Sequence, residues 1–247
     1  MSRYSPTSQE VRTVADRAIC IFASLNLECC LVGGLACSLF GISRTPGDVD
    51  LVIVTALHSQ ESLKRMLCDR DSNFFLVPSK KAFATYKVLW YGYPYRRCKV
   101  DILLPGIMNI PSVPKDRVEQ RSGFPVMPLL PLLMLKLQAW EDHRNHYESY
   151  MREKQHTDVS DIRSLLKIAR RNGISCGNAS NSWIPSSLVE ETKRRVKSWV
   201  ERMGSAENHD WAAIGFDPPR QRRTKASKAS ASDCDRLAER LRSMYIR

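Results

Sequence analysis

Two aspartates in the first quarter of the chain have the spacing of a metal-binding pair. Asp48 directly precedes Val49–Val54, an apolar, β-branched segment that predicts a buried strand, and Asp50 is its second residue. Side chains alternate between the two faces of a strand, so both carboxylates point to the same side. A carboxylate in such a strand is costly unless a cation pairs with it, and Mg²⁺ or Mn²⁺ prefers oxygen ligands.

A third acid, Asp101, lies in a second apolar stretch, Lys99–Leu103. If the two strands are neighbours, the three carboxylates converge and can hold two ions roughly 3.5–4 Å apart. One ion would lower the pKa of an attacking hydroxyl, and the other would stabilise a leaving pyrophosphate. Asp101 could accept the hydroxyl proton. The structural alternative is that Asp48 caps a turn while Asp50 and Asp101 only end their strands.

A pair of glycines precedes the acidic strand. Gly33 and Gly34 separate a predicted strand, Cys29–Val32, from a predicted helix, Leu35–Phe40. Glycine lets the backbone approach phosphate oxygens closely, and the start of a helix favours anions. The order strand, Gly-Gly, helix, loop and acidic strand is more specific than an Asp-x-Asp pair alone.

The remaining patterns predict an α+β protein. A capping box at Thr7 and Glu10 begins a helix that runs to about Leu25. The other expected elements are a helix at Ser59–Cys68, strands at Ala82–Trp90 and Cys98–Leu104 around a turn at residues 91–94, and helices at Met127–Trp140, Thr157–Arg171 and Ser186–Met203.

These elements describe a small mixed β-sheet with flanking helices, followed by a helical C-terminal domain. We expect a catalytic domain over residues 1–110, a helical domain over 111–203, and a basic, mobile tail over 204–247 with a short terminal helix.

Composition indicates a polyanionic partner and excludes a membrane span. The net charge of +12 favours a nucleoside triphosphate (NTP), RNA or DNA, although the segment from Arg220 onward supplies about half of it. No apolar run approaches the roughly 18 residues of a membrane span, and the first residues lack the apolar stretch of a secretory signal. We therefore expect a cytoplasmic protein; the basic run at 220–225 leaves nuclear import open.

The spacing of these motifs resembles the nucleotidyltransferase superfamily with the polymerase-β-like core. Gly33-Gly34, then Asp48-x-Asp50, then Asp101 matches its pattern of a small-residue turn, an acidic pair on a strand and a third acid. The run 41–50 (GISRTPGDVD) resembles the minimal, abortive-infection-type and aminoglycoside-type members. Segments 135–140 and 154–161 resemble the second-domain motifs of those proteins.

The resemblance implies a role for each matched residue. Asp48, Asp50 and Asp101 would be catalytic metal ligands for Mg²⁺ or Mn²⁺. The residues implied to lie along the NTP are Gly33, Gly34, Ser38, Arg44, Thr45, Lys136 and Lys154.

Plainer interpretations of several residues stay open beside these roles. Arg44 could be a solvated loop charge, and Lys136 a surface lysine with a buried stem. Asp158 and Asp161 are interpreted as first-turn acids of their helix, and Lys193-Arg194-Arg195 as a solvated face. Trp90 and its tyrosine neighbours, beside Arg96 and Arg97, could stack on bases or could pack across the hairpin.

The predicted function is metal-dependent transfer of a nucleoside monophosphate (NMP) from an NTP to a hydroxyl, with release of pyrophosphate. The acceptor could be RNA, a protein or a small molecule. The alternative is a catalytically inactive module of the same fold that binds nucleotide or RNA through its basic surface.

Overall fold

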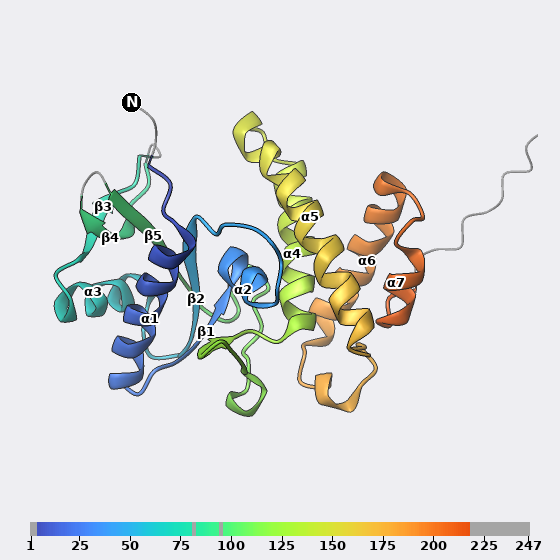
Figure 1. Cartoon of the computed structure of the whole chain (residues 1–247), viewed down its shortest axis with the longest axis horizontal. Coiled ribbons are helices and arrows are strands. Elements are labelled where there is room, and N and C mark those ends of the chain that lie inside the picture. Colours follow the sequence, from blue (N-terminus) through green and yellow to red (C-terminus); the bar gives the residue numbers. More distant parts are fainter. Residues whose placement is uncertain (1–3, 81–82, 94–95, 218–247) are drawn as a thin grey trace, which may run out of the picture.

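The computed structural model describes residues 4–80, 83–93 and 96–217. A mixed β-sheet flanked by helices forms the N-terminal part, and long helices pack beside it (Figure 1). The predicted α+β class, with a helical C-terminal part, is therefore confirmed. The division into domains at residues 110 and 203 stays a prediction.

Seven strands of the described chain form one sheet in the order β3-β4-β5-β2-β1-β7-β6. Their bounds are Glu28–Val32 (β1), Asp48–Val54 (β2), Phe74–Pro78 (β3), Lys87–Tyr93 (β4), Arg96–Leu103 (β5), Glu119–Arg121 (β6) and Phe124–Val126 (β7). β2 runs parallel to β5 and β1 runs parallel to β7, whereas the other neighbours are antiparallel.

Helices cover the two faces of the sheet differently. α1 (Ser8–Ser24) and α3 (Gln60–Arg70) pack against each other and against β5, while the short α2 (Gly33–Leu39) packs on β1 and β2. Alternation along β5 buries Cys98, Val100 and Ile102 in the core, and it directs Lys99 and Asp101 to the opposite face. This alternation decides which residues reach the site.

The helical part consists of α4 (Leu129–Arg144), α5 (Ser149–Arg171), α6 (Ser186–Met203) and α7 (Asn208–Ala213), with a short 3₁₀ turn at Ala179–Asn181. Another 3₁₀ turn, Lys115–Arg117, lies between β5 and β6. Its core contains Trp140, Trp199 and Trp211, whose successive ring centroids are 5.0 Å and 6.2 Å apart. No helix of the described chain is both long and apolar enough to cross a membrane.

Several predicted elements are confirmed. Thr7 caps α1: its hydroxyl accepts a hydrogen bond from the Glu10 backbone N–H, and the Glu10 carboxylate accepts one from the Thr7 backbone N–H. The predicted helix Ser186–Met203 coincides with α6, and the predicted strand at 49–54 is β2 with one more residue, Asp48, at its start.

Other expectations are wrong in their bounds. β4 continues through Tyr91 and Gly92, where a turn was expected, and residues 94 and 95 lie outside the described chain. α5 begins at Ser149 rather than at the predicted Thr157. The prediction missed its first turns because they are mostly exposed and carry no apolar periodicity. The sequence did not predict β3, β6 and β7; β6 and β7 have only three residues each, which leave almost no pattern.

Two expectations about the basic C-terminal residues also need correction. Arg194 and Arg195 donate hydrogen bonds to Glu141 of α4, and Arg195 is buried, so this stretch is not simply a solvated face. Residues 204–217 are not a mobile tail: Trp211 and Phe216 are buried, because these apolar side chains extend the tryptophan core. Residues 218–247 lie outside the described chain.

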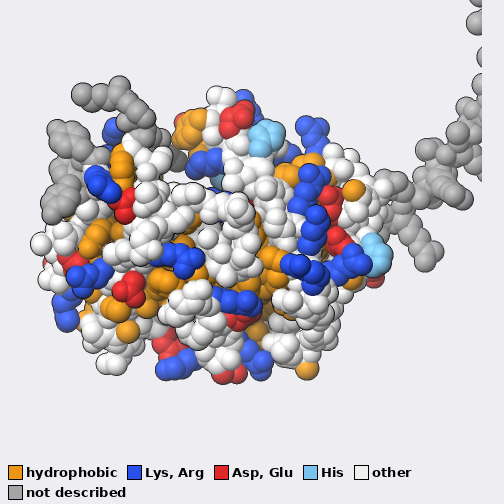
Figure 2. Space-filling view, viewed as in Figure 1, with side chains coloured by type: hydrophobic (Ala, Val, Ile, Leu, Met, Phe, Trp, Pro, Cys, Tyr) orange, Lys and Arg blue, Asp and Glu red, His pale blue; other side chains and the backbone are white. Residues whose placement is uncertain are grey.

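The charge of the surface does not by itself locate a partner. Figure 2 shows Lys and Arg side chains spread over the visible face and interspersed with Asp and Glu. The chemistry must therefore be located from individual residues.

The buried Trp211 provides a test of the fold. Trp211→Ala should lower the free energy of unfolding by about 3–5 kcal/mol, because it removes a fully buried ring that packs edge-on against Trp199. Chemical denaturation followed by circular dichroism measures this change. Leu57→Ala, at a 91% exposed position, is the control and should have little effect. Equal stabilities of the two variants would show that residues 208–217 do not pack as described.

Candidate active site

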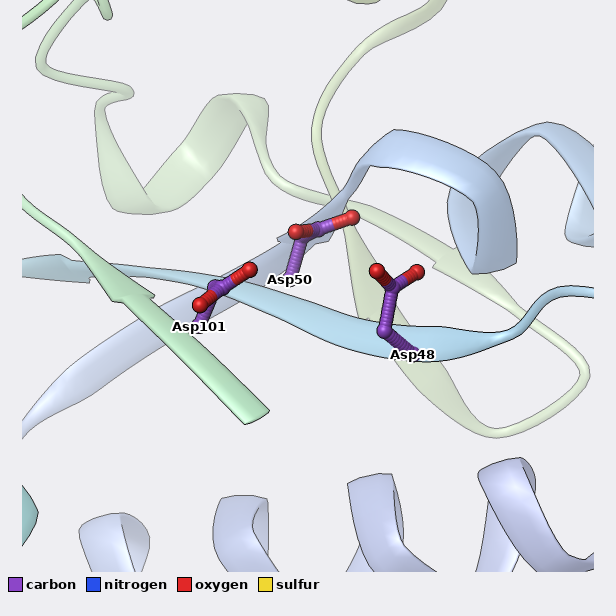
Figure 3. Close-up of side chains that lie close together, drawn as sticks. All are labelled: Asp48, Asp50 and Asp101. Carbon is purple, nitrogen blue, oxygen red and sulfur yellow. The ribbon is translucent and has the colours of Figure 1, made fainter. Parts of the chain in front are cut away.

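Three carboxylates from two neighbouring strands converge on one face of the sheet. The parallel pairing of β2 with β5 sets Asp50 directly opposite Asp101, and Asp48 lies two residues earlier on β2. One ligand oxygen from each of the three side chains lies within 4.8 Å of the other two. Figure 3 shows the three side chains pointing to the same side of their strands. The convergence predicted from the sequence is therefore present.

The electrostatics of this group are unfavourable without a cation. Burial, together with the charges of Asp48 and Asp101, raises the pKa of Asp50 to about 7. The Lys99 ammonium lies 2.5 Å from Asp101 Oδ2 and neutralises part of the charge. An all-carboxylate set that repels itself, with one acid driven toward the neutral form, fits a hard divalent cation such as Mg²⁺ or Mn²⁺.

The glycine pair leaves space for two site side chains. Gly33 has φ +63°, and a Cβ built on it would lie 1.9 Å from Asp50 Oδ2. A Cβ on Gly34 would lie 2.9 Å from Arg44 Nη2. The sequence analysis assigned the glycines to close approach of phosphates. In the structure they also allow Asp50 and Arg44 to pack against the first turn of α2.

A second cluster of charged side chains joins the loop before β2 to α4 and α5. Asp161 Oδ2 accepts from Arg44 Nη1 at 2.5 Å and from Lys136 Nζ at 2.9 Å. Asp158 lies 3.4 Å from Lys136 and 2.6 Å from His143 Nδ1. Asp158 and Asp161 are 4% and 1% exposed, so these ion pairs are buried and hold the helices against the sheet part.

This cluster overturns three of the plainer interpretations. Asp158 and Asp161 lie in the middle of α5 rather than in its first turn. Lys136 is buried rather than at the surface, and Arg44 is paired rather than solvated. Burial alone would lower the pKa of Lys136, yet the neighbouring Cys37, Asp161 and Asp158 raise it above its ordinary value.

The other predicted nucleotide-binding residues are Ser38, Thr45 and Lys154. Ser38 is partly exposed near the end of α2, and Thr45 is exposed in the loop before β2. Lys154 is exposed on α5, one turn before Asp158. Their role at the triphosphate stays a prediction.

Two functional residues were missed by the sequence analysis. Lys99 stands two residues before Asp101 on the same strand and therefore on the same face, so strand alternation could have found it. His143 lies seven residues after Lys136 on α4, which places both on one side of that helix. The helix spacing does not specify the partner of His143, because Asp158 lies on another helix, α5.

The comparison with solved structures decides the fold. A scan against protein-family models found no match to the chain, and neither did a search of curated proteins. The chain is similar to an antigenic nucleotidyltransferase-like protein from Paracoccidioides brasiliensis, with 17% identity and a TM-score of 0.57 over 87% of this chain and 96% of that one. The chain therefore has the fold of this nucleotidyltransferase-like protein.

Two other solved structures are similar to the chain to a lesser degree. The antibiotic-resistance factor ANT(2'')-Ia is 12% identical, with a TM-score of 0.41 over 83% of this chain and 98% of that one. Terminal uridylyl transferase 4 from Trypanosoma brucei is 13% identical, with a TM-score of 0.35 over 81% and 67%. These two similarities are too weak to indicate a fold or an activity, and activity has to be argued from the residues of the site.

The raised pKa of Asp50 predicts that the free energy of unfolding of the metal-free protein depends on pH. Between about pH 4 and 7 the folded state keeps this proton while the unfolded chain loses it, so the free energy of unfolding falls as pH rises. Asp50→Asn should therefore stabilise the metal-free protein at pH 8 by about 1–3 kcal/mol and remove this slope. Asp16→Asn, an exposed aspartate of α1, is the control. If Asp50→Asn proved less stable than wild type at pH 8, the repulsion would be absent.

Removal of a charge from the buried cluster should lower the free energy of unfolding, by more than Asp50→Asn raises it. Asp161→Asn keeps the shape of the side chain but leaves Arg44 and Lys136 without their shared anion. The free energy of unfolding should fall by about 3–5 kcal/mol in urea denaturation. Asp116→Asn, at an exposed ion pair, should change it little. A similar, small change in both variants would contradict the role of Asp161 as a buried junction.

Proposed function

We propose that this protein is a metal-dependent nucleotidyltransferase that moves NMP from an NTP to a hydroxyl acceptor and releases pyrophosphate. The observation that carries the proposal is the approach of Asp48, Asp50 and Asp101 to within 4.8 Å on one face of a sheet with this fold. Such a group is costly to maintain unless it has a cation to bind.

The three aspartates would hold the metal ions and orient the reactants. Bound Mg²⁺ or Mn²⁺ supplies Lewis acidity, which lowers the pKa of the attacking hydroxyl and neutralises charge on the pyrophosphate. Asp48 and Asp50, on one strand, would lie beneath the triphosphate. Asp101, on the next strand, would face the acceptor and could take up its proton. No covalent intermediate with a protein side chain is needed, because positioning and charge neutralisation carry this chemistry.

The triphosphate would lie on the α2 side of the three acids. Gly33 lies against Asp50 there, Gly34 lies against Arg44, and Arg44 and Lys136 both pair with Asp161. Arg44 and Lys136 already share the charge of Asp161, so we expect each to contribute less to phosphate binding than a free cation. The exposed candidates Ser38, Thr45 and Lys154 would add contacts around this core.

A second function is favoured by one specific observation. Lys99 lies 2.5 Å from Asp101 Oδ2, and it occupies an oxygen that a metal ion would use. A stable pair of this kind fits a module that binds nucleotide or RNA without turnover. The two functions differ in whether Asp101 and its neighbours support transfer.

Activity of the Asp48→Asn variant tests the first function. Purified protein would be incubated with α-labelled ATP, GTP, CTP or UTP, with Mg²⁺ or Mn²⁺, and with RNA, protein and small-molecule acceptors. Asp48→Asn should lower transfer by about 100-fold or more, because loss of even an outer partner of a metal site costs 10–100-fold. Its fold should persist, and Asp16→Asn should remain active.

The outcomes separate the two functions. If the wild type transfers NMP and the Asp48→Asn variant does so equally well, Asp48 has no metal role. Thermal stabilisation by NTP and Mg²⁺ without any transfer would support the binding module instead. Absence of both, together with no binding of RNA, would eliminate both functions.

A further inference from the structure

The face of the sheet that carries the three acids continues beyond them across β5, β4 and β3. On neighbouring strands, Asp48 pairs with Lys99, Lys99 pairs with Trp90, and Trp90 pairs with Phe75. Directly paired residues point to the same face, so these four side chains form one row across the sheet. We call Phe75, Trp90, Lys99 and the adjacent Arg97 the row surface.

The row surface is partly exposed and joins aromatic rings to positive charge. The Arg97 guanidinium carbon lies 4.2 Å from the centre of the Trp90 ring, and all four members of the surface are partly exposed. Among the described β3–β5 side chains that share this face, Asp101 is the only acid. The helices α1 and α3 pack on these strands, and the buried residues of β5 lie on the face opposite to the row surface.

The position of the row surface fits the acceptor rather than the NTP. The glycine turn, Arg44 and Lys136 lie on the α2 side of the acids, where β1 and β2 adjoin. The row surface lies on the other side, on β5, β4 and β3, and its Lys99 contacts Asp101. A molecule lying along the row would therefore reach the three acids from the side opposite to the triphosphate.

The chemistry of the row surface selects one class of acceptor. Flat aromatic rings and guanidinium planes stack on nucleobases, and adjacent Arg and Lys pair with phosphates. A polycationic small molecule would be repelled by Arg97 and Lys99. The net charge of +12 gives the same preference for a polyanion.

We propose that the acceptor is the end of a single-stranded nucleic acid, held on the row surface with its terminal hydroxyl at Asp101. This inference rests on the proposed nucleotidyl transfer. In that step the hydroxyl oxygen bonds to the α-phosphorus, and the bond from that phosphorus to the pyrophosphate oxygen breaks. Pyrophosphate leaves with the electron pair, and the hydroxyl proton passes to Asp101 or water.

Binding without NTP or metal tests this proposal separately from catalysis. Fluorescence anisotropy would measure the affinity of the full chain for fluorescein-labelled single-stranded 12-nucleotide RNA and DNA across a series of salt concentrations. Trp90→Ala should weaken binding about tenfold through loss of stacking, whereas Trp90→Phe should retain most of it. Arg97→Leu should weaken binding and reduce the salt slope by about one.

The control is Arg17→Leu, which removes an exposed arginine from α1 on the opposite face of the sheet. It should bind like the wild type, and melting temperatures would show that every variant is folded. The RNA and DNA arms show which sugar is preferred. Unchanged affinity in both Trp90→Ala and Arg97→Leu would overturn the proposal and place the binding elsewhere.

The same experiment distinguishes failure of the inference from failure of the proposed function. Transfer to a protein or small molecule, with no binding of either oligonucleotide, would overturn the inference and leave nucleotidyl transfer standing. Oligonucleotide binding that depends on Trp90 and Arg97, without transfer under any condition, would retain the surface and support the binding module.

Discussion

Repulsion between three carboxylates is the constraint around which the sheet part is built. β2 and β5 pair in parallel at Asp50 and Asp101, and this register brings three like charges within 4.8 Å. The cost appears in the raised pKa of Asp50, and Lys99 offsets part of it through Asp101. The same group of acids requires glycine at position 33, because the Asp50 carboxylate occupies the space that a side chain there would need. A protein keeps such a group when it serves a function.

The buried pairs around Asp161 connect this site to the helical part. Arg44 comes from the loop that leads into the acidic strand, and Lys136 and Asp161 come from α4 and α5. Arg44 also lies against Gly34, so a single arginine contacts both the glycine turn and the helices. A change in the packing of α5 would therefore alter the position of Arg44 against the glycine turn. The cluster thus has a positioning role as well as a structural one.

Sequence reasoning found the acids, the glycine turn and the fold class, because strand alternation and turn chemistry are local. It placed Asp158 and Asp161 in the first turn of a helix, because α5 extends through an exposed segment without periodicity. It could not show that Lys136 is buried, since its two carboxylate partners lie on another helix. It treated Trp90 and Arg97 as features of a hairpin tip. Only the strand register shows that Trp90, Lys99 and Asp48 form one row.

The central claim is that Asp48, Asp50 and Asp101 hold divalent metal against an NTP. Crystals grown with Mn²⁺ and an NTP analogue that is non-hydrolysable between the α- and β-phosphates test it most directly, through the anomalous scattering of manganese. We expect Mn²⁺ within coordination distance of all three carboxylates, about 2.0–2.3 Å, with Lys99 displaced from Asp101 and the triphosphate beside Gly33 and Gly34. Manganese located elsewhere, or a bound analogue with Lys99 still paired to Asp101 and no metal at the acids, would contradict the account.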